Sequence, residues 1–405
     1  MASGLRAKLR AIGSATAAAQ PRDARPGGVI CHVHRLDAVP GLDALSPVGL
    51  RRIGWNGRAF DPERCLFLDT ETTGLSGGAG TVAFLVGVGF VKGGCLTIEQ
   101  YLMRDYADEP ELLDKLANRM DGFDCVCTFN GRTFDMPLLE ARFTMARMRH
   151  RWRELENLDL LPPARRTWKL RLGSCRLARV EELALGMPRG DDLPGSEAPK
   201  RFFEYLRTGD LSLLDAVVEH NRQDIASLAT LLVRLTEIYA EPEKLSERRD
   251  QYSVGRALER QGELGPARAL YRVSAVPAPA GTLAALTGDR VAGMANWRLF
   301  LIARRSGDIE GMRCTLEQMV ARGQMLPEAH TELAKLYEHR LHDIGRALDH
   351  AQQARALCAA GEAEPLDHRI ARLEAKRERA PKAELSGESE PARRARLREK
   401  RRAPD

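Results

Sequence analysis

The chain has 405 residues, of which 43% are hydrophobic and 29% are charged, and its formal net charge is +6. This composition is typical of a folded globular protein, and the length predicts two folded units. No uninterrupted apolar run approaches the roughly eighteen residues of a membrane span, so we expect none. The eight cysteines have neither zinc-finger nor disulfide-scaffold spacing, which favours a reduced, cytoplasmic protein.

The positive charge is concentrated at the end of the chain. Residues 369–405 contain 13 Lys and Arg against 7 Asp and Glu, which leaves residues 1–368 electrically neutral. Such a tail could hold nucleic acid electrostatically or be a solvated, disordered end. Net charge therefore does not decide between functions.

The first 240 residues predict an arm followed by a mixed α/β layer domain. Residues 1–60 are rich in Gly, Pro and Arg with little periodicity, and we predict a partly disordered N-terminal arm there. Short apolar runs predict strands at 65–69, 81–90, 96–103 and 125–129. Helical spacing predicts helices at 109–120, 134–148 and 211–239, whereas 149–210 is irregular. Residues 61–240 are thus predicted to form one domain.

Pairs of predicted helices follow in residues 241–365. The segment 252–271 is similar to one tetratricopeptide repeat, with small residues where its two helices would touch, and two weaker echoes come after it. A generic helical bundle is the alternative. Residues 366–405 are predicted to be a charged, disordered tail.

Two acids stand together where the first predicted strand ends. Residues 69–75 read DTETTGL, and alternate strand residues project to one face, so Asp69 and Glu71 point the same way. Two adjacent carboxylates repel each other and are costly in a core. Mg²⁺ or Mn²⁺ would remove this cost and prefers oxygen ligands. Gly74 permits a tight turn and close approach of a ligand.

Two further motifs carry acids at the ends of predicted elements. Asp135 opens a helix after the turn at residues 129–134, and His220 and Asp224 share one helix face because they are four residues apart. Each has an ordinary alternative: a helix N-cap for Asp135 and a surface pair for His220 with Asp224. The combination of all three motifs favours a catalytic site.

These motifs resemble those of the DEDD exonucleases, a superfamily of RNase H-like nucleases. More closely, residues 50–240 are similar to the YprB-type predicted exonucleases, through the 158–161 and 193–195 segments and the run HNRQDI at 220–225. The resemblance implies an α/β RNase H-like domain with a mixed five-stranded sheet flanked by helices, followed by an all-α helical-repeat domain. Some members of the group carry tetratricopeptide-like C-termini.

The resemblance also implies a mechanism. Asp69, Glu71, Asp135 and Asp224 would hold two Mg²⁺ or Mn²⁺ ions, which activate a water and neutralise the phosphate. His220, with an ordinary pKa of about 6.5, would orient or deprotonate that water. In the family a histidine usually precedes the last Asp by five residues, whereas here the offset is four.

Substrate contacts are implied at several positions. Leu75 would lie against a terminal base, and the other candidates are Thr72, Gly74, Asn130 and Arg132. Lys169 and Arg176 are further candidates for phosphate contacts, although a solvated Lys or Arg is the commoner outcome.

The sequence predicts a hydrolase, a 3′–5′ exonuclease that acts on a single-stranded 3′ end of DNA or RNA. Two alternatives stay open. One is a catalytically weak or inactive nucleic-acid-binding scaffold that acts through its helical repeats, which could also bind a protein partner. The other is a structure-selective endonuclease. We expect no membrane partner.

Overall fold

The computed structural model describes residues 28–57, 59–74, 80–187, 189, 193–277, 289–359 and 363–379. The chain divides into two compact units, Met1–Glu263 and Leu264–Asp405. Among the helices described, none is both long and apolar enough to cross a membrane.

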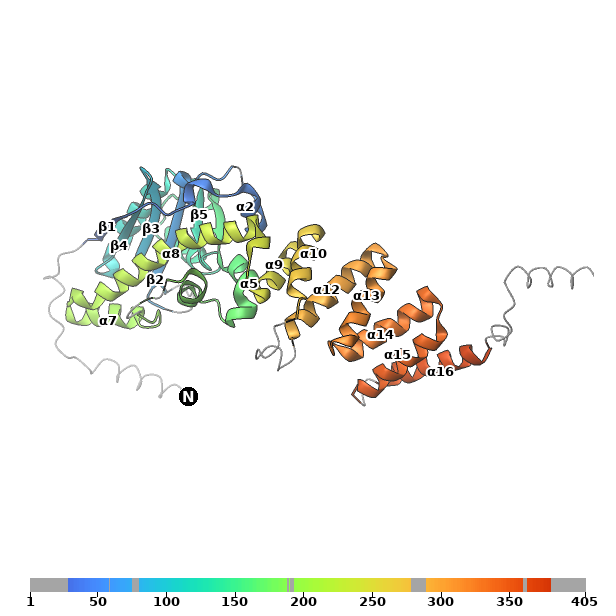
Figure 1. The fold of residues 1–405 in the computed structure, drawn as a ribbon. Helices are drawn as coiled ribbons and strands as arrows, with labels where there is room; N and C mark the ends of the chain where they lie inside the picture. Colours follow the sequence, from blue (N-terminus) through green and yellow to red (C-terminus); the bar gives the residue numbers. More distant parts are fainter. Residues whose placement is uncertain are drawn as a thin grey trace, which may run out of the picture. The chain divides into compact units, whose positions relative to one another are not determined.

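The first unit is built on a mixed six-stranded sheet in the order β1-β4-β3-β2-β5-β6 (Figure 1). Its strands are β1 (Ile30–Leu36), β2 (Cys65–Thr72), β3 (Ala83–Lys92), β4 (Cys95–Leu102), β5 (Cys125–Thr128) and β6 (Glu156–Asp159). Strands β2, β5 and β6 run parallel, whereas β3 is antiparallel to β2 and β4, and β1 is antiparallel to β4. The prediction of a mixed α/β sheet is confirmed, and its strand count is corrected from five to six.

Two strands lie where the residue pattern predicted none. Strand β1 falls in the segment predicted as an arm, because it is an edge strand whose pattern is reversed: Cys31 and Val33 are exposed, while the polar His32 and His34 are half-buried. Strand β6 has only four residues, of which Leu158 alone is buried. Strand β1 alternates with its polar side chains inward, and β6 is too short to show a pattern.

Helices cover both faces of the sheet. They include α2 (Pro47–Ile53), α3 (Glu109–Met120), α4 (Asp135–Met145), α5 (Leu161–Leu172), α6 (Leu177–Val180), α7 (Ala198–Thr208) and α8 (Asp215–Ala240). Helix α8 lies across β2, β3 and β4 and also packs on α2 (Figure 1). Gly89 allows this approach, because a Cβ there would lie 2.4 Å from Ile225 Cγ2. Leu66, Leu68 and Phe84 belong to a core that includes side chains of α3, α4 and α7.

The region predicted as irregular, residues 149–210, contains α5 and α7. Each helix has proline in its first turn, Pro162 in α5 and Pro199 in α7. Proline is tolerated there because the first helical N–H groups need no partner within the helix. The pair Pro162-Pro163, which indicated a break in the sequence, therefore marks the start of α5.

The described residues of the second unit form helices joined by short connections, with no strand among them. Its helices are α10 (Leu264–Ser274), α12 (Arg290–Ser306), α13 (Ile309–Ala321), α14 (Leu326–Leu336), α15 (Ile344–Leu357) and α16 (Glu364–Arg379), with a π-helical turn η9 (Tyr337–Leu341) after α14. Each helix packs on the next one along the chain, as in helical-repeat proteins.

Two predicted boundaries differ from the structure. We placed the start of the repeats at residue 241, but α9 (Arg248–Arg260) packs on α5 and belongs to the first unit. We predicted disorder from residue 366, but residues 366–379 continue α16, whose Leu366 and Leu373 are buried. Residues 1–27 of the predicted arm and 380–405 of the tail lie outside the described residues.

Candidate active site

The first two predicted acids lie on β2, the central strand on which α8 packs. Asp69 pairs with Gly87 of β3, and Glu71 pairs with Leu85 before the register shifts at Thr72. Strand alternation turns both acids to the same face as their neighbour Phe67. Glu71 is only 8% exposed.

A buried polar chain orients Asp69. Asn221 of α8 donates through Nδ2 to Asp69 Oδ2 at 2.9 Å, and its own Oδ1 accepts from Gln100 Nε2 at 2.8 Å. Asn221 and Gln100 are both fully buried. Gly87 makes room for this chain, since a Cβ there would lie 2.1 Å from Asn221 Oδ1. The sequence motif contained Asn221, but helical spacing from His220 and Asp224 provided no reason to assign it a role.

Asp135 is the first residue of α4 and accepts a hydrogen bond from the Thr70 hydroxyl. The turn before it is held by Asp159, at the end of β6. Its carboxylate accepts from the backbone N–H groups of Asn130 at 2.8 Å and Leu161 at 3.0 Å. Asn130 has φ of 70°, the left-handed region that Asn tolerates better than most residues. Asp159 therefore positions the loop that carries Asp135; it lies in the 158–161 segment on which the family resemblance partly rests, but the sequence assigned it no role.

The four predicted acids are close enough to influence one another's charge. Burial raises the pKa of Asp69 well above its usual range, and the negative charges of Asp224, Asp135 and Glu71 raise it further, against the hydrogen bond from Asn221. Three elements, β2, α4 and α8, thus bring like charges together. Such an arrangement is favourable only when a cation or protons balance it.

Burial also raises the pKa of Asp135, to about 6, and the charge of Asp159 acts in the same direction. The hydrogen bond from Thr70 opposes this rise because it favours the charged carboxylate. Asp135 is thus held in surroundings that favour its neutral form more than water does.

A buried arginine contacts the fourth acid. Arg189 forms ion pairs with both Glu181 and Asp224, and the three side chains are only 8%, 1% and 14% exposed. Burial lowers the pKa of Arg189, but the hydrogen bond and charge of Glu181 and the charge of Asp224 outweigh it and raise the pKa. Burial raises the pKa of Asp224, against the charges of His220 and Arg189. Neither Arg189 nor Glu181 lies in a recognisable motif, so the sequence did not indicate them.

His220 faces the acids through one ring nitrogen. Its Nε2 lies 3.9 Å from Glu71 Oε1 and 3.7 Å from Asp224 Oδ2, and its Nδ1 lies 3.2 Å from Arg189 Nη1. A guanidinium can only donate, so Nδ1 is the acceptor in this contact. The neutral ring then carries its proton on Nε2, directed toward the carboxylates.

Two of the predicted substrate residues, Thr72 and Gly74, make contacts within their own loop at the end of β2. The Thr72 hydroxyl donates to the Gly74 carbonyl at 2.8 Å. A Cβ at Gly74 would lie 3.2 Å from Thr81 Oγ1, which is closer than most such contacts, so glycine suits this position. Leu75 lies outside the described residues.

The predicted substrate residues after β5 are held in their turn. Asn130 Oδ1 accepts from the Thr133 hydroxyl at 2.9 Å. The exposed Arg132 donates through Nη2 to the Asn157 carbonyl at 3.3 Å, which directs it toward β6.

The described residues contain no group of three or more His, Cys, Asp or Glu already arranged to hold a metal ion. The donor chemistry nevertheless fits Mg²⁺ or Mn²⁺, because all four acids offer oxygen and their mutual repulsion favours a bound cation. Arg189 provides positive charge at Asp224, so an ion using that carboxylate would have to compete with the guanidinium.

Residues 66–236 match the RNase_H superfamily. The uncharacterized protein YprB of Bacillus subtilis (strain 168) is 30% identical over 330 residues, which are 79% of this chain and 77% of YprB. A family B DNA polymerase from the archaeon Pyrobaculum calidifontis aligns with 51% of this chain and 30% of its own, at 16% identity and a TM-score of 0.35. That alignment is too weak to support any argument, whereas the YprB match is extensive. The chain belongs to the YprB family, and its first unit carries the RNase H-like domain.

Proposed function

We propose that the protein is a metal-dependent nuclease, a 3′–5′ exonuclease of the DEDD type that hydrolyses phosphodiester bonds of DNA or RNA. The observation that carries this proposal is the convergence of Asp69, Glu71, Asp135 and Asp224 from three separate elements. Clustered carboxylates with perturbed pKa values are characteristic of functional sites. The membership in the RNase_H superfamily supports the same chemistry.

The four acids would hold Mg²⁺ or Mn²⁺, two ions in this proposal. Bound there, the ions would neutralise the phosphate and promote attack by water. The side chains around the acids do the positioning: Asn221 fixes the Asp69 carboxylate and Thr70 fixes that of Asp135. Fixed ligands matter because a poorly oriented reactant loses much of the rate gained from proximity.

His220 is the proposed general base, and its surroundings set a condition on that role. A base needs a free lone pair facing the water, but Nε2 carries the proton while Arg189 donates to Nδ1. Release of Arg189 from His220 and Asp224 would free Nδ1 to carry the proton instead. Metal loading at Asp224 and activation of His220 would then be linked through Arg189.

The proposal is tested with end-labelled single- and double-stranded DNA and RNA, incubated with Mg²⁺, Mn²⁺ or EDTA. We expect mononucleotides to be released from a 3′ end of a single strand, with metal only, and the Asp69→Ala variant to release none. Thermal unfolding of the variant serves as the folding control. Undiminished degradation by Asp69→Ala would refute this site.

The contact between Arg189 and Asp224 favours a second candidate, a nucleic-acid-binding scaffold with weak or no activity. A guanidinium in the acid cluster can balance its charge without metal. Calorimetric titration with Mn²⁺ separates the two candidates: two ions bound per chain favour the nuclease, and none favours the scaffold. The helical repeats, which we take to be tetratricopeptide-like, would serve protein binding in either case.

A structure-selective endonuclease is the remaining alternative. A circular single-stranded DNA distinguishes it, because an obligate exonuclease leaves the circle intact. Cleavage of the circle at a rate similar to that of the linear strand would replace our assignment.

A further inference from the structure

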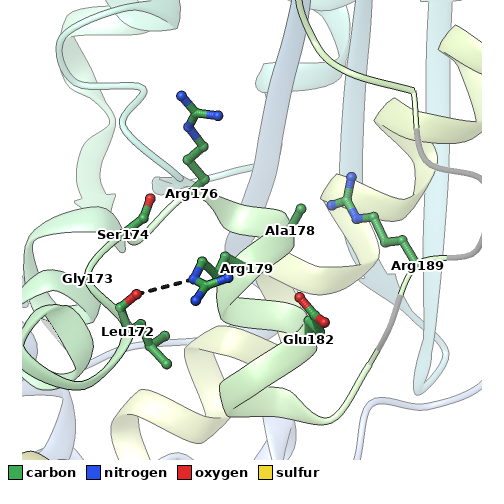
Figure 2. Close-up of a pocket in the computed structure, with 8 residues that line it drawn as sticks. All are labelled: Leu172, Gly173, Ser174, Arg176, Ala178, Arg179, Glu182 and Arg189. Atoms are coloured by element: carbon green, nitrogen blue, oxygen red, sulfur yellow. Dashed lines mark hydrogen bonds between the residues drawn. The ribbon is translucent and has the colours of Figure 1, made fainter.

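A cavity of about 800 Å³ opens beside the acid cluster, between the end of α5 and the segment after α6 (Figure 2). It is lined by Leu172, Gly173, Ser174, Arg176, Ala178, Arg179, Glu182 and Arg189. Three arginines oppose one glutamate, so the lining is positively charged. The volume is in the range of ligand sites, roughly 300–1,000 Å³.

The sequence makes this region basic over a longer stretch. Between Asp159 and Glu181 the chain has six Lys or Arg residues and no acid. They are Arg165, Arg166, Lys169, Arg171, Arg176 and Arg179. The positive charges of Lys169 and Arg165 act on the Cys175 thiol, which places them near the loop that lines the cavity. The positively charged region therefore extends beyond the residues that line the cavity.

Some of these cations pair with other groups of the fold, whereas Arg176 and Arg179 at the cavity make few such contacts. Arg171 pairs with Asp250, and Arg166 donates to the Ile53 carbonyl. By contrast Arg176 is exposed, and its guanidinium has no hydrogen bond or ion pair within the described residues. Arg179 is also exposed, and in the described part of the chain its guanidinium donates to the Leu172 carbonyl alone, at 3.2 Å (Figure 2).

Arg189 connects the cavity to the candidate active site. It lines the cavity and at the same time contacts Asp224 and His220. A chain of phosphates entering the acid cluster would thus find Arg179 and Arg176 further along its path. A single strand can place its backbone in such a recess, whereas a duplex presents its phosphates on a wide convex surface.

We propose that this cavity binds the sugar–phosphate backbone of a single-stranded nucleic acid, next to the bond that is cut. The inference rests on the proposed nuclease function and adds the subsite that holds its substrate. Among the described residues no aromatic side chain lines the cavity, so the proposed recognition does not rely on base stacking. Recognition through phosphates alone is insensitive to sequence and strongly dependent on salt.

The test measures binding separately from cleavage. The reference is the full-length Asp69→Asn variant in EDTA, titrated against fluorescein-labelled 12-nucleotide single strands of DNA and RNA at several salt concentrations. In this background, Arg176→Glu with Arg179→Glu should weaken binding at least tenfold. The slope of log Kd against log salt should fall by about 0.7 for each phosphate that the variant no longer neutralises. Arg176→Gln alone, at an exposed position, should weaken binding less, in the same direction.

The matched control reverses two other exposed arginines, Arg151 and Arg153, to Glu. They lie just before β6, which is parallel to β2, so they are at the opposite end of the sheet from Asp69 and Glu71. Each pairs with a surface glutamate and contributes little to stability. This variant carries the same change in net charge and should bind the strand like the reference.

The outcomes separate the two proposals. Equal binding by the cavity variant and the reference, an equal loss with the control pair, or an equally large loss for duplex DNA would each overturn the cavity assignment. A reference that binds no single strand would overturn it as well. If the wild-type protein degrades nothing with metal while the cavity variant still loses binding, the nuclease proposal fails and the cavity assignment stands.

Discussion

Two acids, one in each unit, have opposite electrostatic surroundings. In the helical unit, Glu338 has no exposed side-chain surface and accepts from Arg369 at 2.5 Å and from Arg372 and Lys376 at 2.7 Å. Burial alone would raise its pKa, but the hydrogen bonds from Lys376 and Arg372 outweigh it and the pKa is lowered. Asp69 faces other carboxylates and its pKa is raised. A balanced acid stabilises the fold, whereas an unbalanced cluster is suited to bind a cation.

Arg189 balances part of the charge of the acid cluster, as three cations balance Glu338. Its removal should have the largest effect on stability. The side chain of Glu181 is only 1% exposed, and in Arg189→Leu it loses the arginine with which it pairs. An unpaired buried charge typically costs about 3–5 kcal/mol. We expect a decrease of that order in the free energy of unfolding, measured by urea denaturation in EDTA.

The control for this variant is Arg222→Leu, on α8, whose partner Glu219 is half exposed. Loss of that surface pair should cost less than about 1 kcal/mol. Adding Glu181→Leu to Arg189→Leu should restore part of the lost stability, because the unpaired charge is then gone. Equal effects of the two arginine substitutions would show that Arg189 is an ordinary surface cation.

The second prediction concerns the orientation of Asp69. Asn221→Ala removes the hydrogen bond to Asp69 Oδ2. Misplacement of a reacting group by about 1 Å can cost on the order of a hundredfold in rate. We expect kcat to fall about 10- to 100-fold while the affinity for a single strand in EDTA is unchanged. Ser227→Ala, another buried polar position on α8, should leave both values unchanged; a similar loss of kcat there would contradict a specific role for Asn221.

The sequence predicted the centre of the first unit better than its edges. Strands β2 to β5 and helices α3 and α8 were predictable because each has an apolar face with a regular period. Strand β1 was missed because its half-buried positions include two histidines while Cys31 and Val33 are exposed, and helix α5 was missed because its proline pair was interpreted as a break. The elements that could be predicted were therefore those whose apolar residues recur with a regular period.

The candidate active site shows the same difference between residues that local patterns predict and residues that only the fold reveals. The four acids and His220 follow from short motifs, since their spacing along a strand or a helix places them on one face. Arg189 and Gln100 act through contacts with Asp224 and Asn221, which lie 35 and 121 positions away in the chain, and Glu181 acts by pairing with Arg189. Such contacts leave no local pattern, so only the folded structure brings them together. The positioning residues were for this reason absent from the prediction.

The third prediction uses the opposite surroundings of the two acids directly. An amide has nearly the shape of a carboxyl group without its charge. Asp69→Asn should therefore raise the free energy of unfolding at pH 8 in EDTA, because it removes repulsion within the cluster. Glu338→Gln should lower it, because three cations lose their acceptor charge. The two changes should therefore have opposite signs.

Chemical denaturation of both variants beside the wild type provides the measurement. Shifts of the same sign would show that the two sites do not differ in the way described. The addition of Mn²⁺ should distinguish the two sites further. It should stabilise the wild type and Glu338→Gln equally, and it should not stabilise Asp69→Asn.

The last prediction is a pH dependence that originates from Asp135. Its pKa is raised from an ordinary 3.8 to about 6, so between these values the folded protein holds a proton that the unfolded chain has released. Stability then falls as the pH rises through this window and is constant above it. The wild type in EDTA should accordingly lose stability relative to Asp135→Asn between about pH 4 and pH 7.

Thr70→Val tests the cause of this dependence. The Thr70 hydroxyl favours the charged form of Asp135, so its loss should raise the pKa of Asp135 further. The fall in stability should then extend to higher pH than in the wild type. A difference between wild type and Asp135→Asn that stays flat, or that increases with pH, would mean that Asp135 is not held in surroundings that favour its neutral form. The acid cluster would then need no cation to balance it at this position.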